Sequence, residues 1–287
     1  MSWQALKCVK LRKVVFEEVL GFRPERALEI VEALETRLEG SAAGDFFSNG
    51  CSPHAPYSVS AELYKAVGEL ASRRGIPLAT HLAETRAELE FLRYGTGEFS
   101  DFLAQMGALP AGWKPPALAP VFYLEKLGLL GESTVLIHCN CLDPESMAQI
   151  LSHRCSVVYC PRSHAFFGHE EHPVRRLLDL GVNVALGTDS LASNQSLSIL
   201  DEMRFLYRER RDLKTEEILR MATLNGAAAL RFGGMLGRLR RGYWADMTIL
   251  GLPRNLSSRN LTSQILEGAG ECIATVVRGE VALQRGS

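Results

Sequence analysis

Short apolar segments alternate with amphipathic helical segments along most of this chain, and that alternation limits the possible folds more than any other feature. The expected strands are 14–20, 46–51, 76–81, 134–138, 156–160 and 182–187. Each is followed by a helix-type pattern, which gives six strand–helix units before Gly233. A crossover between parallel strands needs a dozen or more residues, so the sequence predicts an α/β protein with a mostly parallel sheet.

Two parts of the chain depart from this alternation. Segment 94–120 is rich in Gly and Pro, and we expect a long excursion with a short helix near 99–106, which is a candidate lid. Beyond Gly233 the pattern changes to short strands near 247–250, 275–277 and 280–283. We therefore expect a small β element at the C-terminus. The alternation alone fits a doubly wound sheet and a closed barrel equally well.

Composition narrows the classes of partner. The net charge of −1 gives no electrostatic basis for binding nucleic acid. No apolar run approaches the roughly 20 residues that a membrane-spanning helix needs. The seven cysteines are odd in number and lack framework spacing, which favours a reducing, cytoplasmic setting. We expect a small-molecule substrate, with no nucleic acid and no membrane as partners.

Polar residues follow four of the predicted strands at their C-terminal ends. His54 follows strand 46–51, His81 and His138 end the next two strands, and Asp189 follows strand 182–187. Active sites of (β/α) barrels are assembled at this end of the strands, so the placement favours a barrel over a doubly wound sheet. Any one of these residues alone is more often a structural histidine or a turn carboxylate. The ordered series of four favours a site.

The residue types suit one kind of chemistry. Two imidazoles and a carboxylate are ligands that Zn²⁺ or Fe²⁺ accepts. Glu84 lies three residues after His81, where its carboxyl group could move protons beside a metal-activated water; the other interpretation is a solvated carboxylate at a helix start. His153, His169 and His172 are expected in surface or loop roles, and the role of His164 stays open.

Six segments together resemble the amidohydrolase superfamily, in particular its deaminase and chlorohydrolase branch. The segments are Ser52–Ser58, His81–Thr85, Ile137–Cys139, Cys160–Ser163, Gly187–Ser190 and Gly242–Leu250. The resemblance extends from about Val14 to the C-terminus. It implies a (β/α)8-type, TIM-like barrel and a metal-dependent hydrolase of carbon–nitrogen bonds other than peptide bonds. The implied reaction is hydrolytic deamination of a heterocycle or nucleoside-like small molecule.

The resemblance also implies roles for individual residues. His81, His138 and Asp189 match the metal-ligand and metal-adjacent positions for one divalent ion, Zn or Fe. Glu84, His138 and Asp189 match the catalytic positions. Residues in substrate-contacting positions are His54, Ser163 and Glu84. A homodimer is expected by the same analogy.

One part of the family pattern is missing. No H-x-H occurs in the chain, although this motif supplies two metal ligands on the family's first strand. Strand 14–20 resembles the family's third barrel strand. We therefore expect an incomplete barrel of about six strand–helix units in residues 1–232 and a remnant of the family's β-sandwich in residues 233–287. The alternative to an enzyme is a catalytically inactive fragment or an assembly subunit of the same family.

Overall fold

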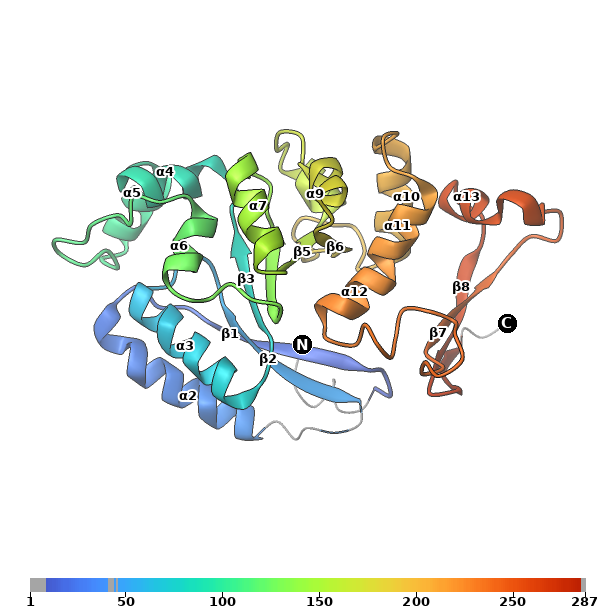
Figure 1. Cartoon of the computed structure of the whole chain (residues 1–287), viewed down its shortest axis with the longest axis horizontal. Helices are drawn as coiled ribbons and strands as arrows, with labels where there is room; N and C mark the ends of the chain where they lie inside the picture. The colour runs from blue at the N-terminus through green and yellow to red at the C-terminus, as the bar shows by residue number, and fades with distance from the viewer. Residues whose placement is uncertain (1–8, 41–43, 45, 285–287) are drawn as a thin grey trace.

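The fold was analysed in a computed structural model that describes residues 9–40, 44 and 46–284. Six strands form one parallel sheet in the order β1–β2–β3–β4–β5–β6, which is also their order along the chain (Figure 1). The strands are β1 (Lys13–Val19), β2 (Phe47–Pro53), β3 (Leu78–Leu82), β4 (Thr134–His138), β5 (Ser156–Tyr159) and β6 (Asn183–Leu186). The predicted parallel α/β sheet is confirmed.

The sheet forms part of a barrel. Its strands follow one another without any reversal of order, as they do in a (β/α) barrel and unlike the strands of a doubly wound sheet. Within the described residues, β1 and β6 are the two outer strands and do not pair with each other. The expectation of a partial TIM-like fold with six strand–helix units is therefore confirmed.

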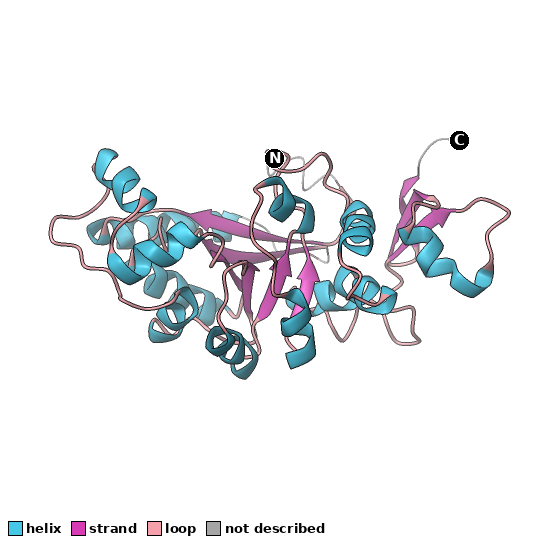
Figure 2. Cartoon of the chain, turned by 90° about the horizontal axis from the view of Figure 1, so that it is seen from above, coloured by secondary structure: helices cyan, strands magenta, loops and turns pink. Residues whose placement is uncertain are grey.

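Helices follow the strands and cover the outer face of the sheet (Figures 1 and 2). Ser60 caps the helix after β2 by accepting a hydrogen bond from Leu63 N at 3.2 Å, and Asp143 accepts one from Ser146 N at 2.7 Å. The helices between the strands are η1 (Pro24–Arg26), α2 (Ala27–Gly40), α3 (Ala61–Arg74), α4 (Arg86–Tyr94), α5 (Glu98–Gln105), α6 (Pro120–Lys126), α7 (Pro144–Ser152), α8 (Pro161–Phe166) and α9 (Val174–Leu180).

The main hydrophobic core lies between the sheet and these helices. Fully buried side chains from helices, such as Leu34 and Leu63, pack with Leu136 and Val157 from the strands. A second cluster holds the excursion 94–120 against the barrel, where the Trp113 ring stacks on Phe91 with 4.7 Å between ring centroids. Aromatic stacking therefore fixes a segment in which sequence periodicity indicated only one short helix.

Three helices follow β6, namely α10 (Ile199–Glu209), α11 (Thr215–Ala222) and α12 (Leu224–Ala229). Residues 215–230 carry a continuous helical pattern in the sequence, but the structure divides them into α11 and α12. The chain breaks at Thr223, whose φ and ψ of −127° and −83° are not helical. The helix α8 was also missed, because its six residues are too few to show a helical period.

The C-terminal part forms a separate small sheet. Antiparallel strands β7 (Met247–Gly251), β8 (Glu271–Val277) and β9 (Glu280–Gln284) pair in that order, with η2 (Ser258–Asn260) and α13 (Leu261–Leu266) between the first two. Figure 2 shows this sheet at one end of the molecule, apart from the six-stranded sheet. Among the helices of the described residues, none is both long and apolar enough to span a bilayer.

Candidate active site

The predicted site residues gather at the C-terminal edge of the parallel sheet. His81 is the next-to-last residue of β3, His138 is the final residue of β4, and Asp189 follows the end of β6. His54 follows β2, and its backbone N–H donates to Val19 O in β1 at 3.1 Å. Because all six strands are parallel, their C-terminal ends meet at one edge, and the sheet itself brings these distant residues together.

The backbone at this edge is strained. Ala83, His138, Cys139 and Asp189 all have a left-handed conformation, with φ between 50° and 70°. Non-glycine residues adopt this region at a cost of about 1–3 kcal/mol each, and such residues cluster at functional sites. The ends of β3, β4 and β6 therefore carry strain at or next to a predicted site residue.

The His81 ring is held by the backbone of the neighbouring loop. Its Nδ1 lies 2.9 Å from the carbonyl oxygen of His54, which can only accept a hydrogen bond. Nδ1 therefore carries the proton, and Nε2 presents a free lone pair. Histidines that bind metals are oriented in this way by a carbonyl or carboxylate behind the ring.

His138 and Glu84 face each other. His138 Nε2 lies 3.5 Å from Glu84 Oε1, and the His81 and His138 rings are near-parallel with 5.5 Å between their centroids. Burial and the neighbouring His81 lower the pKa of His138 to about 4, so its ring is neutral at pH 7. Burial raises the pKa of Glu84, which makes this carboxyl group a better proton donor near neutral pH.

A second carboxyl group, Glu88 on α4, fixes the loop that carries Glu84. Its Oε1 accepts from Ala83 N and its Oε2 from Glu84 N, both at 2.9 Å, and its side chain is fully buried. Asn140 Nδ2 donates to Glu84 O at 3.1 Å from the opposite side. The sequence does not predict this role for Glu88, because an acidic residue in the first turn of a helix is common and usually solvated.

Asp189 is surrounded by hydrogen-bond donors. Oδ2 accepts from Ser163 Oγ at 2.6 Å and from Ser193 Oγ at 2.9 Å, and Oδ1 accepts from Ser190 N at 2.6 Å. Burial raises the pKa of Asp189, but these hydrogen bonds outweigh burial and leave the pKa below its usual value. Ser163, predicted to contact substrate, is almost fully buried and has its hydroxyl group directed at Asp189.

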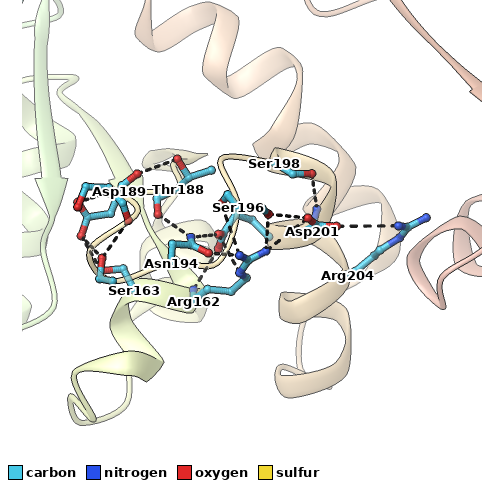
Figure 3. Close-up of polar contacts among 12 residues, drawn as sticks. Arg162, Ser163, Thr188, Asp189, Asn194, Ser196, Ser198, Asp201 and Arg204 are labelled. Atoms are coloured by element: carbon cyan, nitrogen blue, oxygen red, sulfur yellow. Dashed lines mark hydrogen bonds and ion pairs between the residues drawn. The ribbon is translucent and has the colours of Figure 1, made fainter. Parts of the chain in front are cut away.

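A polar network behind Asp189 orders the loop between β6 and α10 (Figure 3). Asn194 Nδ2 donates to Thr188 O at 2.7 Å and to Glu202 Oε1 at 2.6 Å, and its Oδ1 accepts from the Arg162 guanidinium. Arg162 also donates to Ser196 Oγ at 3.1 Å. The network joins α8, the loop and α10, and thereby holds the backbone on both sides of Asp189.

His172 supports the site from the outside of the barrel. It lies in a loop, as expected, but it is buried rather than at the surface. Its Nε2 donates to the carbonyl oxygen of His138 at 2.9 Å, and its ring stacks on Tyr159 at 3.8 Å between centroids. The residue thus holds the strained backbone of His138. No spacing in the sequence links positions 138 and 172, so only the fold reveals this contact.

The aromatic rings of Tyr57 and Phe99 lie beside His54. Its ring meets the Tyr57 ring edge-on at 5.8 Å between centroids, and Tyr57 stacks on Phe99 at 3.9 Å with an interplanar angle of 7°. Phe99 belongs to the excursion 94–120, which therefore reaches the edge of the site. A flat, half-buried aromatic surface beside polar groups suits an aromatic heterocycle.

The expected divalent metal can be tested against these donor atoms. The chemistry of His81, His138 and Asp189 suits such an ion. Among the described residues, however, the donor atoms of these three side chains do not all lie within 4.8 Å of one another, whereas those of Glu18, His54 and His81 do. The donor chemistry of the three predicted ligands therefore suits a divalent metal, but their side chains do not converge on one point in this structure.

The fold and the site define the class of protein. A partial (β/α) barrel with histidines and carboxyl groups at successive strand ends is typical of metal-dependent hydrolases. A model of the amidohydrolase family matches residues 4–282, and the chain belongs to this family. The predicted resemblance is confirmed.

Relatives within the family are named as deaminases. The chain is 35% identical over 245 residues to 5-methylthioadenosine/S-adenosylhomocysteine deaminase of Pyrococcus furiosus, covering 82% of this chain and 53% of the relative. It is also 35% identical over 244 residues to aminodeoxyfutalosine deaminase of Deinococcus radiodurans, covering 81% of this chain and 57% of the relative. The chain thus spans about half the length of the curated relatives it matches.

Solved structures agree with the fold. Aminofutalosine deaminase of Helicobacter pylori, in complex with methylthio-coformycin, superposes with a TM-score of 0.85 at 26% identity, covering 97% of this chain and 68% of that chain. A zinc-bound adenosine deaminase of Xanthomonas campestris gives a TM-score of 0.74 at 25% identity, covering 94% of this chain and 60% of that chain.

Proposed function

We propose that this chain carries out, or forms the larger part of an enzyme that carries out, metal-dependent hydrolytic deamination of a nucleoside-like amine. The observation that carries the proposal is the meeting of Glu84, His138 and Asp189 at one edge of the sheet, with the pKa values of the two carboxyl groups shifted in opposite directions. Two carboxyl groups whose pKa values are shifted in opposite directions can act as general acid and general base at the same pH. The relatives named above are deaminases, and none supports the alternative of a non-catalytic subunit.

The residues have distinct tasks in this proposal. Asp189, held ionised by its hydroxyl and amide donors, accepts a proton from the attacking water. Glu84, whose pKa is raised, protonates the ring nitrogen next to the carbon under attack. The proton taken by Asp189 then passes to the departing amine, and the proton that remains on the new hydroxyl group returns to Glu84. Water and the amine thereby become a ring carbonyl and ammonia, and both carboxyl groups regain their starting states. His138 stays neutral and offers a hydrogen bond to the attacking oxygen.

A divalent metal, when bound, would lower the pKa of a water molecule so that hydroxide forms near neutral pH. We propose His81, His138 and Asp189 as its family-type ligands, with Zn or Fe as the ion; zinc is present in the adenosine deaminase structure described above. We further propose that His54 and Ser163 contact the substrate and that the barrel portion ends near residue 232, where the β-sandwich remnant begins. The proposal also includes a cytoplasmic setting and a homodimer. His54 beside Tyr57 is the side of the site where a heterocycle would stack.

Ammonia release tests the proposal. The purified chain, dialysed against Zn²⁺ or Fe²⁺, is incubated with 5′-methylthioadenosine, adenosine and cytidine, and ammonia is measured. We expect release from an adenosine-type substrate and a loss of at least roughly 100-fold in Glu84→Gln, because general acid–base catalysis contributes about 10²–10⁴-fold. Absence of ammonia from every substrate with metal-loaded wild-type chain would count against the proposal.

A further inference from the structure

A second cavity lies beside the candidate active site and is separate from it. Its lining comes from α4, the starts of α6, α7 and α9, and the loops after β4, α8 and α10 (Figure 1). The side chains proposed for the reaction, its metal and its substrate do not line it. Its volume of about 900 Å³ lies within the range of roughly 300–1,000 Å³ that small-molecule sites occupy. We call it the outer cavity.

Unpaired arginines give the outer cavity its charge. Each of its carboxylates already has a partner: Glu170 is paired with Arg86, Glu171 and Asp212 with Arg210, and Asp143 with Ser146 N. Arg93 on α4 and Arg176 on α9 also line the cavity, and within the described part of the chain their side chains have no hydrogen bond or ion pair. Guanidinium groups bind the oxygens of phosphate through two parallel N–H donors, so this lining favours an anionic group.

Two lining side chains also contain a buried polar atom that has no hydrogen-bond partner among the described residues. These atoms are His172 Nδ1 and Arg175 Nε. His172 Nε2 donates to His138 O at 2.9 Å, so Nδ1 carries the lone pair and needs a donor, whereas Arg175 Nε can only donate. Buried polar atoms without partners are costly and rare. A ligand with both hydroxyl groups and anionic oxygens would supply both partners, directly or through a bound water.

The apolar part of the lining is aliphatic. Leu89 and Leu142 contribute to it, and the described residues of the lining include no phenylalanine, tyrosine or tryptophan. A nucleobase would find no stacking surface here, in contrast to the Tyr57 ring beside His54. We propose that the outer cavity binds a phosphorylated sugar or a similar phosphorylated polyol, with Arg93 and Arg176 binding its phosphate group and His172 accepting from a hydroxyl group.

Isothermal titration calorimetry with glucose 1-phosphate tests the inference. This probe has a phosphate group and several hydroxyl groups but no free aldehyde, so it does not react with lysines. Glucose and inorganic phosphate each carry only half of the recognised chemistry, and we expect both to bind at least about 10-fold more weakly. The affinity for glucose 1-phosphate should be the same with and without Zn²⁺, because the cavity is separate from the proposed metal ligands.

Variants locate the binding. Arg93→Gln and Arg176→Gln should each weaken the binding of glucose 1-phosphate about 5–10-fold, and Arg176→Glu should weaken it further. The exposed Arg254, which has no partner among the described residues, provides the control Arg254→Gln, which should stay within about twofold of the wild type. His172→Phe should weaken glucose 1-phosphate but not inorganic phosphate. Melting temperatures show that each variant has folded.

The contrary results are equally distinct. The inference is overturned if glucose 1-phosphate does not bind, if inorganic phosphate binds as tightly, or if both Arg93→Gln and Arg176→Gln bind like the wild type. Binding that requires Zn²⁺ and ignores these substitutions would place the phosphate group at the metal and would also overturn it.

A ligand in the outer cavity would act on the reaction through two lining residues. Asn140 Nδ2 donates to Glu84 O at 3.1 Å, and His172 Nε2 donates to His138 O at 2.9 Å. This consequence rests on the proposed function: saturating glucose 1-phosphate should change kcat or KM for ammonia release about fivefold or more, and should not do so in Arg176→Glu. Binding with unchanged ammonia release would overturn the coupling and leave the binding site intact. Binding in a chain that releases no ammonia from any substrate would overturn the proposed function alone.

Discussion

The buried carboxyl group of Glu88 should make the stability of this protein depend on pH in an unusual direction. Burial raises the pKa of Glu88 to about 8 in the folded chain, against an ordinary value of 4.5, although the amides of Ala83 and Glu84 partly oppose the shift. The folded state therefore binds one proton more than the unfolded state between these two values. The stabilisation from this proton is complete below pH 4.5 and is lost as the pH rises through 8.

The size of the effect follows from the same numbers. Each pH unit in this window removes about 1.4 kcal/mol of the free energy of unfolding. Glu88→Gln has nearly the shape of the protonated acid and cannot ionise, so it lacks this slope. At pH 5 we expect the variant to be about 1–3 kcal/mol less stable than the wild type, because the glutamine amide nitrogen cannot accept from the second backbone N–H. Between pH 5 and 7 the variant should gain about 3 kcal/mol relative to the wild type.

The assay is thermal unfolding of both proteins at pH 5, 6, 7 and 8. For a domain of this size, 3 kcal/mol corresponds to a relative shift in melting temperature on the order of 5–10 °C. Titrating groups that do not interact with Glu88 affect both proteins equally, so the difference between the two curves reports Glu88 together with its electrostatic interaction with Glu84. Parallel curves would refute the reasoning, because they would mean that the two amide donors keep Glu88 ionised throughout this range.

Three further predictions follow from contacts around the site. His172→Phe keeps the stacking on Tyr159 but loses the donor to His138 O, which should cost about 1 kcal/mol of the free energy of unfolding at pH 7. Because burial lowers the pKa of His172 to about 3, the stability of the wild type falls as the pH drops below 6.5. Unfolding measured at pH 5 should therefore show a smaller fall in stability for the variant than for the wild type. Ser163→Ala removes one donor to Asp189, so the acidic limb of kcat/KM should move to higher pH with an activity loss of about 10-fold, and an unmoved limb would contradict the role given to Ser163. Gly187→Ala places a Cβ 2.7 Å from Val158 Cγ1 and should cost about 1–3 kcal/mol in thermal unfolding, whereas Gly131→Ala, with no neighbour within 4 Å, should cost less.

Much of the fold could be predicted because its signals are local. Buried strands such as 134–138 are short apolar runs, and helix starts at Ser60 and Asp143 carry capping residues that satisfy free backbone amides. What was missed depends on context. The break at Thr223 interrupts a continuous helical pattern, and α8 is too short to show a period.

The candidate site likewise has some features that the sequence predicts and others that only the fold reveals. The placement of His81, His138 and Asp189 at one edge of the sheet could be predicted, because parallel strands align their C-terminal ends. Glu88 and His172 act on the backbone of other residues, and such contacts have no sequence spacing by which to recognise them.

The central claim is that water replaces an amine at this site with Glu84 as the proton donor. The most direct test is the reaction of metal-loaded chain with 5′-methylthioadenosine in ¹⁸O-labelled water, with product mass and ammonia measured together. Hydrolytic deamination predicts one labelled oxygen in the product for each ammonia released, and loss of both signals in Glu84→Gln. Ammonia without labelled product, or equal turnover in Glu84→Gln, would contradict the account.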